Sequence, residues 1–513
     1  MTKKKCLLIN PPIKLKDPPY NMPLGLTCIA AVIEDEGHDV AIFDNNAYKL
    51  THEQLLGEIQ GESWDIIGIG NILTTYTWQK KMFKLLKHEF PNSLLIIGGG
   101  LPSSLQDEAM SLIPEVDILC IGEGERTISQ ILKNHDTKNW DDVRGILYRK
   151  KDKIVRTPPQ KLLSEEELSK LPHPKYDLLP LDIYFKYSSV PQCPEAMLSK
   201  RRIQMESSRG CPFRCTFCID LSTGTPRNLS HSDRASLYVD SLPESIKVRY
   251  YDPKWVVDLM RELRIKYCID FVNFVGENYT VNKKSVIEFC DLLEKEGLTD
   301  LDPPLHWSVA AHVNTIDREM LQRMKDTGCS YLDLGFESMN ADVLSKGIVK
   351  GATPEKNEWG FRQCIDIGIY PLTNFMIGLP NESIQSVYDT TKFLVENKIE
   401  CGPFFVTPYP KTGLFEEYKD KIIEKFGSVE NYVIKCENDI SMDFIVNLTK
   451  YNDAELLGLR QMIMNHDLEQ IKKFAEYKGE QIVDNKNIIV APISIQGNNS
   501  KNVETKNQIG VKV

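Results

Sequence analysis

The first 150 residues alternate short apolar runs with amphipathic stretches of helical length. Each apolar run ends in Asn, Asp or Gly or is followed at once by Gly, and the runs cover residues 6–10, 40–44, 66–70, 94–98 and 118–121. Such alternation is typical of a parallel sheet wrapped by helices. We therefore predict a doubly wound, Rossmann-like α/β domain over residues 1–150, with a ligand-binding edge at the carboxyl ends of its strands.

Glycines concentrate at that predicted edge. They close or follow the last three apolar runs, at Gly68, Gly70, Gly98, Gly99, Gly100, Gly122 and Gly124. Glycine lets a backbone approach a bulky ligand closely, although a tight turn explains any single one of them equally well. A dinucleotide site is disfavoured because no G-x-G-x-x-G pattern follows the first run.

The rest of the chain divides by composition into four segments. Residues 151–200 are rich in proline, which resists regular structure, and are interpreted as a linker. Strand and helix patterns alternate again over residues 201–435, and a helical extension follows over 436–495. The polar residues 496–513 are predicted to be disordered.

Composition and charge narrow the class of protein. The net charge is -10 and the pI is about 5.6, which does not suit a surface that tracks phosphates, so nucleic acid is not expected as a partner. No transmembrane segment is expected, because no long uncharged apolar run is present. The chain has 13 cysteines, and this odd number argues against a disulfide framework. We therefore predict a cytoplasmic protein.

Cys211, Cys215 and Cys218 place three thiols in one short loop with the spacing C-x3-C-x2-C. A structural zinc site and an ordinary iron-sulfur cluster each take four protein ligands, but the next candidates, Cys193 and His231, are distant in sequence. A zinc ribbon would need a second C-x2-C pair, which is absent. A cubane held by three cysteines would leave one iron open, whereas the alternative is three incidental buried thiols.

The loop sequence RGCPFRCTFC resembles the cluster loop of the radical S-adenosylmethionine (SAM) superfamily. The resemblance implies that Cys211, Cys215 and Cys218 hold a 4Fe-4S cluster whose open iron binds SAM. One electron from the cluster would then cleave SAM to a 5'-deoxyadenosyl radical. The resemblance also implies that residues 201–435 form a partial (β/α)6 TIM-type barrel and that Phe217 contacts the cofactor.

Other motifs of the superfamily imply further contacts to SAM. Gly276 and Glu277 resemble the position that holds the methionine amino group. Glu337 stands in a G-x-E-S strand end, and Ile377 stands in a strand similar to the one that cradles adenine. Many relatives have an Arg near the position of His312 that could reach the SAM carboxylate. This chain lacks that Arg, so His312 or Ser308 is a further candidate contact, and a place in the core is the alternative.

Residues 1–150 resemble the cobalamin-binding domain that is fused to many radical SAM enzymes. The resemblance rests on the triple glycine, the Pro-Leu-Gly-Leu run and the Gly-Glu-Gly-Glu run. It implies contacts to cobalamin from Leu24, Gly25, Gly70, Gly98, Gly99, Gly100, Gly122 and Glu123. The loop at residues 10–17 lacks the histidine of the Asp-x-His-x-x-Gly motif, so we predict His-off cobalamin, with His38 and His52 at the surface.

Together these resemblances predict a cobalamin-dependent radical SAM C-methyltransferase that acts on an unactivated carbon. Two alternatives stay open: a radical SAM cyclase, oxidase or rearrangement enzyme without methyl transfer, and a non-catalytic cobalamin or iron-sulfur sensor. The expected partners are a small-molecule, lipid or peptide substrate and an external electron donor such as flavodoxin or ferredoxin. The sequence does not specify the substrate or the oligomeric state.

Overall fold

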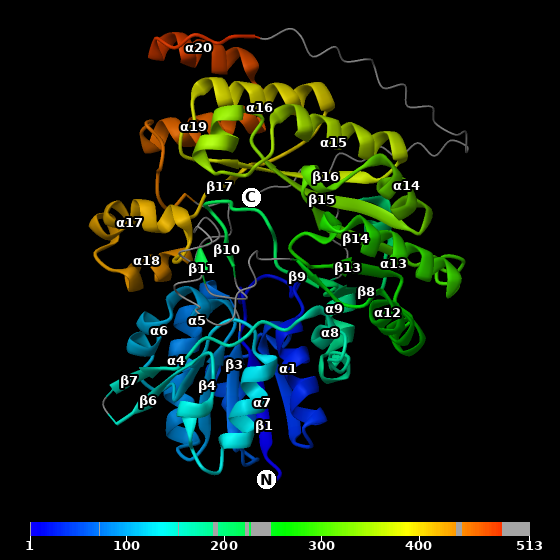
Figure 1. Cartoon of the computed structure of the whole chain (residues 1–513). Coiled ribbons are helices and arrows are strands. Elements are labelled where there is room, and N and C mark those ends of the chain that lie inside the picture. The colour runs from blue at the N-terminus through cyan, green and yellow to red at the C-terminus, as the bar shows by residue number, and fades with distance from the viewer. Residues whose placement is uncertain are drawn as a thin grey trace.

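The computed structural model describes residues 2–70, 72–151, 153–187, 193–220, 225–226, 248–437 and 444–484. They form the two α/β domains that the sequence predicts. In Figure 1 the N-terminal domain, blue to cyan, lies below the second domain, green to yellow. The short strands β10 (Ile219–Asp220) and β11 (Thr225–Pro226) lie between them.

The N-terminal domain is built on a seven-stranded sheet with the order β2-β1-β3-β4-β5-β6-β7. The first five strands run parallel, and β6 and β7 add an antiparallel hairpin at one edge. The strands are β1 Lys5–Asn10, β2 Asp39–Asp44, β3 Ile66–Gly70, β4 Leu94–Gly98, β5 Ile118–Cys120, β6 Ile146–Lys150 and β7 Lys153–Arg156. The strand order changes direction between β1 and β3, because β2 was added on one side of β1 and β3 on the other. Open α/β sheets bind their ligands at such a switch point.

Alternate residues of these strands pack on opposite faces of the sheet. Cys6 and Leu8 of β1 pack against α1 and α7, whereas Leu7 and Ile9 pack in the core under α3, α4, α5 and α6. The helices are α1 Leu24–Asp35, α2 Asn45–Tyr48, α3 His52–Ile59, η1 Leu73–Thr75, α4 Tyr76–Glu89, α5 Gly100–Leu105, α6 Asp107–Leu112, α7 Glu125–Asn134 and η2 Trp140–Asp142. The doubly wound arrangement is thereby confirmed.

The hairpin of β6 and β7 carries the N-terminal sheet past residue 150, so the predicted domain boundary falls inside it. The proline-rich segment after it forms short helices between its prolines: α8 Glu165–Leu168, η3 Tyr176–Leu178, α9 Leu181–Lys186 and α10 Pro194–Leu198. This segment contacts both domains. Tyr184 Oη donates to Asp44 Oδ2 at 2.6 Å, and Tyr176 Oη donates to the carbonyl of Gln204 at 2.8 Å.

The second domain is a half-barrel of six parallel strands in the order β17-β16-β15-β14-β13-β8. Its strands are β8 Arg202–Met205, β13 Phe271–Phe274, β14 His306–Ala311, β15 Cys329–Glu337, β16 Tyr370–Ile377 and β17 Phe404–Phe405. Its helices are α12 Pro253–Tyr267, η4 Tyr279–Val281, α13 Lys283–Lys295, η5 Val313–Thr315, α14 Arg318–Asp326, η6 Val343–Gly347, α15 Pro354–Ile367 and α16 Ile384–Asn397. Strands that follow one another in sequence lie side by side, as the predicted partial (β/α)6 barrel requires.

The described residues after the barrel form four helices: α17 Gly413–Phe426, α18 Val429–Cys436, α19 Asp453–Met464 and α20 Leu468–Lys478. α18 lies against α4 of the N-terminal domain, where Glu430 Oε1 accepts from Tyr76 Oη at 2.6 Å. α19 and α20 pack on α16. The predicted disordered tail at 496–513 lies outside the described residues. Among the helices that the structure describes, none has both the length and the apolar composition needed to cross a bilayer.

Gly328, which follows α14, provides a test of the barrel packing. Its φ is +96°, and a Cβ on it would lie 2.8 Å from the backbone oxygen of Leu305. Gly328→Ala is therefore expected to lower the free energy of unfolding by about 1 to 3 kcal/mol, measured by chemical denaturation. In the control Gly57→Ala, on α3, an added Cβ meets no atom within 4 Å, so alanine should raise stability by about 0.5 to 1 kcal/mol. Changes of the same sign at both positions would contradict this packing.

Candidate cofactor sites

The three cysteines lie in the loop between β9 (Ser208–Arg209) and β10. Backbone hydrogen bonds hold this loop on two sides. The N–H of Thr216 donates to the carbonyl of Ile348 at 3.0 Å, and the N–H of Leu414 donates to the carbonyl of Thr216 at 2.9 Å. The loop is thus fixed between the segment after β15 and the start of α17, at the carboxyl end of the half-barrel, where barrel enzymes place their active residues.

The three thiols lie close enough to influence one another. Cys215 is buried, whereas Cys211 and Cys218 are half-buried. Burial raises the pKa of the Cys215 thiol to about 12; Lys350 lowers this pKa, and charge on Cys218 and Cys211 raises it. A cationic metal centre bound to the three sulfurs would offset the repulsion between the thiolates.

The arrangement does not suit a single metal ion. Within the described part of the chain, no three His, Cys, Asp or Glu side chains form a group that could hold one ion. A cubane takes each thiolate on a different iron and therefore needs a wider spacing than one ion does. Three thiols are the kind of donor that an iron-sulfur cluster takes, and ligation of a cluster by these cysteines stays a prediction.

A buried ion pair lies next to the cysteine loop. Lys350 Nζ donates to Glu337 Oε1 at 2.7 Å, and the two side chains are 8% and 10% exposed. Lys350 Nζ also lies 5.9 Å from the centre of the Phe217 ring. Glu337 ends β15 at a bulge with φ of +64°, a strained conformation for a residue other than glycine. Its side chain turns back over Gly335, where a Cβ would lie 2.5 Å from Glu337 Oε1.

β15 carries a second carboxylate on the same face of the strand. Asp333 Oδ1 accepts from Asn374 Nδ2 at 2.5 Å. Burial, followed by the charge of Glu337, raises the pKa of Asp333 to about 6. Asp333 alternates along β15 with Leu332 and Leu334, which pack under the helices, so it faces the barrel interior. Glu337 follows the bulge, and its Oε1 lies over Gly335 on that same face. The interior therefore offers two carboxylates and one ammonium to a polar ligand.

The predicted SAM contacts Gly276, Glu277 and Ser308 do not share one environment. Gly276 lies against Ser208, because an added Cβ would stand 3.0 Å from the Ser208 hydroxyl, and Glu277 beside it is exposed. Ser308, in contrast, is fully buried and donates to Asn273 Oδ1 at 3.1 Å.

The packing of Ile377 bears on its predicted contact with adenine. It is fully buried in the core between the half-barrel and its helices. The neighbouring Met376 packs, together with Phe217, against a different hydrophobic cluster. Contact between Ile377 and adenine therefore stays a prediction that this packing does not favour.

His312 and Lys350 make contacts beside the cysteine loop that the sequence did not indicate. The rings of Phe213 and His312 stack with centroids 3.6 Å apart. His312 Nδ1 accepts a hydrogen bond from the N–H of Asn314 at 3.2 Å. The protonated Nε2 donates a hydrogen bond to the carbonyl oxygen of Lys350, also at 3.2 Å. Burial, and then Lys350, lowers the pKa of His312 to about 4, so the ring is neutral at pH 7. No local motif marks Lys350, which pairs with a residue 13 positions earlier.

The predicted cobalamin glycines gather at the carboxyl edge of the N-terminal sheet. Gly70 and Gly98 end β3 and β4 and stand opposite each other in the sheet register. Gly99 has φ of +88° and precedes Gly100, which begins α5. Gly122 has φ of +76°, and its N–H donates to Ser103 Oγ at 3.2 Å. Left-handed backbone at these turns needs glycine.

This edge has room for a bulky ligand. Leu24 and Gly25 begin α1 at the same edge. A Cβ added to Gly25 or to Gly98 would meet no atom within 4 Å. A glycine-lined edge with open space beside its backbone fits the flat, large ring of cobalamin.

Glu123, a predicted cobalamin contact, is bonded to a residue of the other domain. Arg249 Nη2 and Nη1 donate to its two oxygens at 2.6 and 3.1 Å, and the N–H of Leu163 donates to Glu123 Oε2 at 3.1 Å. Both carboxylate oxygens are therefore used in a contact between the two domains. The sequence could not reveal this, since the partner lies 126 positions away.

The histidines of the N-terminal domain also differ in part from the prediction. His38 is buried, and its Nδ1 accepts from the N–H of Lys4 at 3.1 Å, at the amino end of β1 and away from the glycine-lined edge. His52 is half-buried and stacks on Trp78 with centroids 4.8 Å apart. Whether bound cobalamin is His-off stays a prediction.

Glu382, in the loop after β16, predicts a pH dependence of stability. It is buried and accepts from the N–H of Gly378 at 2.6 Å, and burial raises its pKa to about 8 from the ordinary 4.5. Because the folded chain holds this proton more tightly, stability should fall as pH rises from about 4.5 to about 8 and then level off. Glu382→Gln should remove roughly 1 kcal/mol or more of that decline in urea titrations. An unchanged decline in the variant would contradict this assignment.

Comparisons with known proteins agree with this geometry. The family model described as Radical SAM superfamily matches residues 205–394, and the one described as B12 binding domain matches residues 15–132. A protein of Pyrococcus horikoshii named as an uncharacterized methyltransferase is 29% identical over 421 residues, which cover 80% of this chain and 82% of that protein.

Two further similarities extend the comparison. An anaerobic magnesium-protoporphyrin IX monomethyl ester cyclase of Cereibacter sphaeroides is 23% identical over 411 residues, covering 78% of this chain and 61% of that protein. The solved structure of TsrM from Kitasatospora setae, a radical SAM methyltransferase with cobalamin and a [4Fe-4S] cluster bound, superposes with a TM-score of 0.65 at 14% identity, covering 97% of this chain and 94% of that one. This last similarity is one of fold.

The fold and the site define a two-domain α/β protein whose half-barrel carries a three-cysteine loop, which is the class of radical SAM enzymes. Its N-terminal domain is a B12-binding domain. A B12-binding domain therefore precedes a radical SAM domain in this chain, which is the domain arrangement that the sequence predicts.

Proposed function

We propose that this protein is a cobalamin-dependent radical SAM methyltransferase that adds a methyl group to an unactivated carbon of its substrate. The observation that carries the proposal is the position of the two candidate sites. The glycine-lined edge and the cysteine loop belong to different domains, yet Glu123, next to Gly122, is ion-paired to Arg249 of the barrel domain. The methyltransferase name of the Pyrococcus horikoshii relative supports the same reaction class.

The barrel residues have distinct parts in this proposal. Cys211, Cys215 and Cys218 would hold the 4Fe-4S cluster, which together with SAM supplies a 5'-deoxyadenosyl radical when bound. Lys350 offers a buried ammonium to a carboxylate such as that of SAM, at charge-assisted hydrogen-bond strength. The ring of Phe213, in the cysteine loop, stacks on His312 and fixes the loop against the start of η5.

The N-terminal edge has a separate part. Gly70, Gly98, Gly99 and Gly122 would line cobalamin, which supplies a transferable methyl group when bound. Leu24 and Gly25 at the start of α1 would border it. Since no histidine stands in the loop after β1, we propose that the protein leaves the lower face of the cobalt without an imidazole.

Labelled products distinguish this proposal from its rivals. The chain is reconstituted anaerobically with iron, sulfide and hydroxocobalamin, reduced with flavodoxin or titanium citrate, and given SAM with a deuterated methyl group. We expect 5'-deoxyadenosine, S-adenosylhomocysteine and deuterated methylcobalamin. Deoxyadenosine without S-adenosylhomocysteine would instead support a radical reaction without methyl transfer, as the cyclase relative suggests. Absence of both products would support a sensor.

Gly98→Leu separates the two sites in this assay. The substitution fills the open space beside the glycine-lined edge with a branched side chain. We expect at least about tenfold less retained cobalamin and a matching loss of S-adenosylhomocysteine, while deoxyadenosine formation persists. Unchanged cobalamin retention, measured by absorbance after desalting, would place cobalamin elsewhere. Gly57→Ala on α3 serves as the control and should leave both products unchanged.

A further inference from the structure

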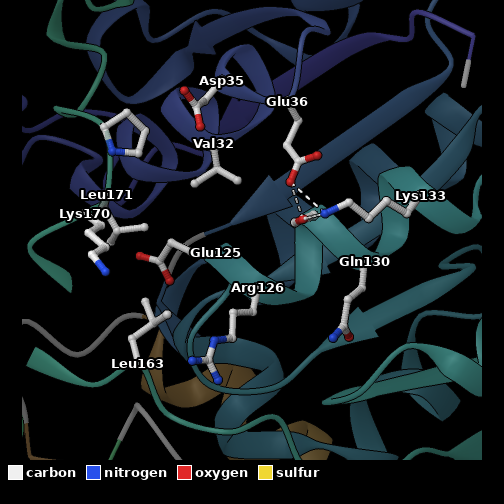
Figure 2. A pocket seen from close by; sticks show the side chains of 12 residues that line it. Val32, Asp35, Glu36, Glu125, Arg126, Gln130, Lys133, Leu163, Lys170 and Leu171 are labelled. Carbon is white, nitrogen blue, oxygen red and sulfur yellow. Dashed lines mark hydrogen bonds and ion pairs between the residues drawn. The ribbon is translucent and has the colours of Figure 1, made fainter. Parts of the chain in front are cut away.

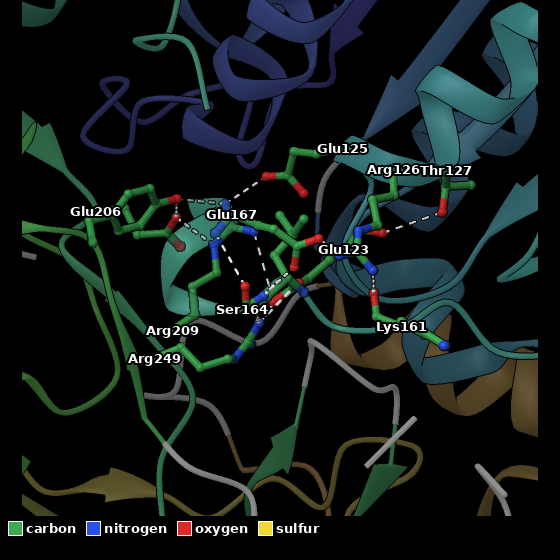
Figure 3. A network of polar contacts seen from close by, with 12 residues as sticks. Glu123, Glu125, Arg126, Thr127, Lys161, Ser164, Glu167, Glu206, Arg209 and Arg249 are labelled. Carbon is green, nitrogen blue, oxygen red and sulfur yellow. Dashed lines mark hydrogen bonds and ion pairs between the residues drawn. The ribbon is translucent and has the colours of Figure 1, made fainter. Parts of the chain in front are cut away.

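A cluster of charged side chains is buried between the two domains (Figure 3). The N-terminal domain contributes Glu123 and Glu125, from the loop before α7 and from its first turn. The barrel domain contributes Arg209 of β9 and Arg249 of β12 (Arg249–Tyr250), which stand opposite each other in an antiparallel pair. Their side chains are between 5% and 10% exposed, so the charges are almost completely removed from water.

Arg209 is the centre of this cluster. Its Nη2 donates to Glu125 Oε1 at 2.6 Å, and its Nε donates to Glu206 Oε2 at 2.8 Å. Tyr251 Oη accepts from Arg209 Nη2 at 2.9 Å and donates to the same Glu206 oxygen at 2.8 Å. The planar guanidinium is therefore held in one orientation by partners from both domains.

The cluster is poorly explained as a source of stability. Removing two arginines and two glutamates from water costs several kcal/mol per ion, and well-packed apolar residues often stabilise such positions equally well. Fixed donor directions, in contrast, specify one relative orientation of the parts they join. The directional bonds of Arg209 thus point to positioning of one domain on the other.

Arg209 is also directly connected to both candidate sites. It is separated from Cys211 by one residue, Gly210, whose φ is +93°. On the other side, Glu123 follows Gly122, the left-handed glycine of the cobalamin edge. Arg209 Nη1 lies 3.8 Å from Glu123 Oε1, while Arg249 bonds that carboxylate directly. A shift of the Gly122 turn would therefore move the side chain of Glu123, and with it that of Arg209, which lies two residues before Cys211.

Glu125 has freedom to take part in such a shift. Its Oε2 is buried and has no hydrogen-bond partner among the described residues. A pocket of 310 Å³ opens beside it, between α1, α7 and the segment after residue 162 (Figure 2). The pocket is not a charge-selective site, because its cations Arg126, Lys133 and Lys170 are already paired with glutamates. It does provide space for the Glu125 carboxylate to move.

We infer that Arg209 is a positioning residue that couples occupancy of the cobalamin edge to the state of the cysteine loop. The inference rests on the proposed function in one respect, namely that cobalamin binds at the glycine-lined edge. Thermodynamic linkage makes this coupling reciprocal. If a bound cluster changes the affinity of the protein for cobalamin by some factor, bound cobalamin changes its affinity for the cluster by the same factor. The Arg209–Glu125 bond is the contact that carries this coupling.

The test compares hydroxocobalamin affinity in the iron-free chain and in the cluster-loaded chain, by equilibrium dialysis. For the wild-type chain we expect the Kd to differ by about fivefold or more between the two states. For Arg209→Lys, which keeps the charge but loses the fork, and for Glu125→Gln, the ratio should fall to within about twofold. The Kd of the iron-free variants should stay within about threefold of wild type. Iron content is matched before each comparison.

A control and a second readout separate positioning from a general loss of structure. Lys80→Met removes the more exposed interdomain pair with Glu430 and should keep the wild-type ratio. In hydrogen exchange, hydroxocobalamin should protect the amides of residues 208–218 in the iron-free wild type and not in Arg209→Lys. A wild-type ratio within twofold, or variants that keep the ratio and the protection, overturn the inference. A wild-type chain that does not bind hydroxocobalamin overturns the proposed function as well.

Discussion

Cys215→Ala is expected to abolish iron binding and SAM cleavage. Cys215 is the most buried of the three loop cysteines, and the backbone of the next residue is bonded to the segment after β15. Iron should fall from about four per chain to near zero, and deoxyadenosine should become undetectable. Iron analysis and product quantification measure both.

The control for this prediction is Cys193→Ala. Cys193 is the nearest upstream cysteine, and it is buried at the start of α10, where its sulfur accepts from the N–H of Ala196 at 3.4 Å. This variant should bind iron as the wild type does, with a loss of stability of about 1 kcal/mol from the missing cap. Iron loss in Cys193→Ala equal to that in Cys215→Ala would mean a fourth protein ligand, which is incompatible with an open iron for SAM.

The sequence predicted the elements whose signal is local. Apolar runs that end in Asn, Asp or Gly marked β1 to β5, because a strand buried on both faces must be apolar along its whole length. Met320 and Met324 of α14 stood at helical spacing and are fully buried. The predicted domain boundary cut the hairpin between β6 and β7, since charged residues such as Lys150 and Lys153 at its turn resemble a linker.

The site was predictable only where residues are close in sequence. The cysteine loop is one short segment, so its spacing was visible. Glu123 was assigned to cobalamin because it stands among glycines, but Arg249 neutralises it from the other domain. Lys350 had no motif at all, since its position over Gly335 depends on the turn through η6 that follows β15. Long-range charge pairing follows from the folded geometry, which no local pattern contains.

Lys350→Met should be the most destabilising change in the barrel interior. The substitution keeps much of the side-chain volume but leaves the Glu337 carboxylate buried without its cation. Loss of one partner of a buried pair costs about 3 to 5 kcal/mol, because the remaining charge can neither be hydrated nor be paired. The expected result is a matching fall in the free energy of unfolding, measured by urea denaturation with tryptophan fluorescence. SAM cleavage should be lost together with it.

A second substitution tests the cause of that loss. In Lys350→Met with Glu337→Gln the buried charge is absent, so most of the lost stability should return, whereas SAM cleavage should not. Lys283→Met is the matched control, because Lys283 pairs with Glu319 at the surface with 44% and 79% exposure and should change stability by less than about 1 kcal/mol. A double variant as unstable as Lys350→Met would show that the lysine acts through packing. Recovery of SAM cleavage in the double variant would remove Lys350 from the proposed SAM site, because an ammonium that binds a carboxylate has no substitute there.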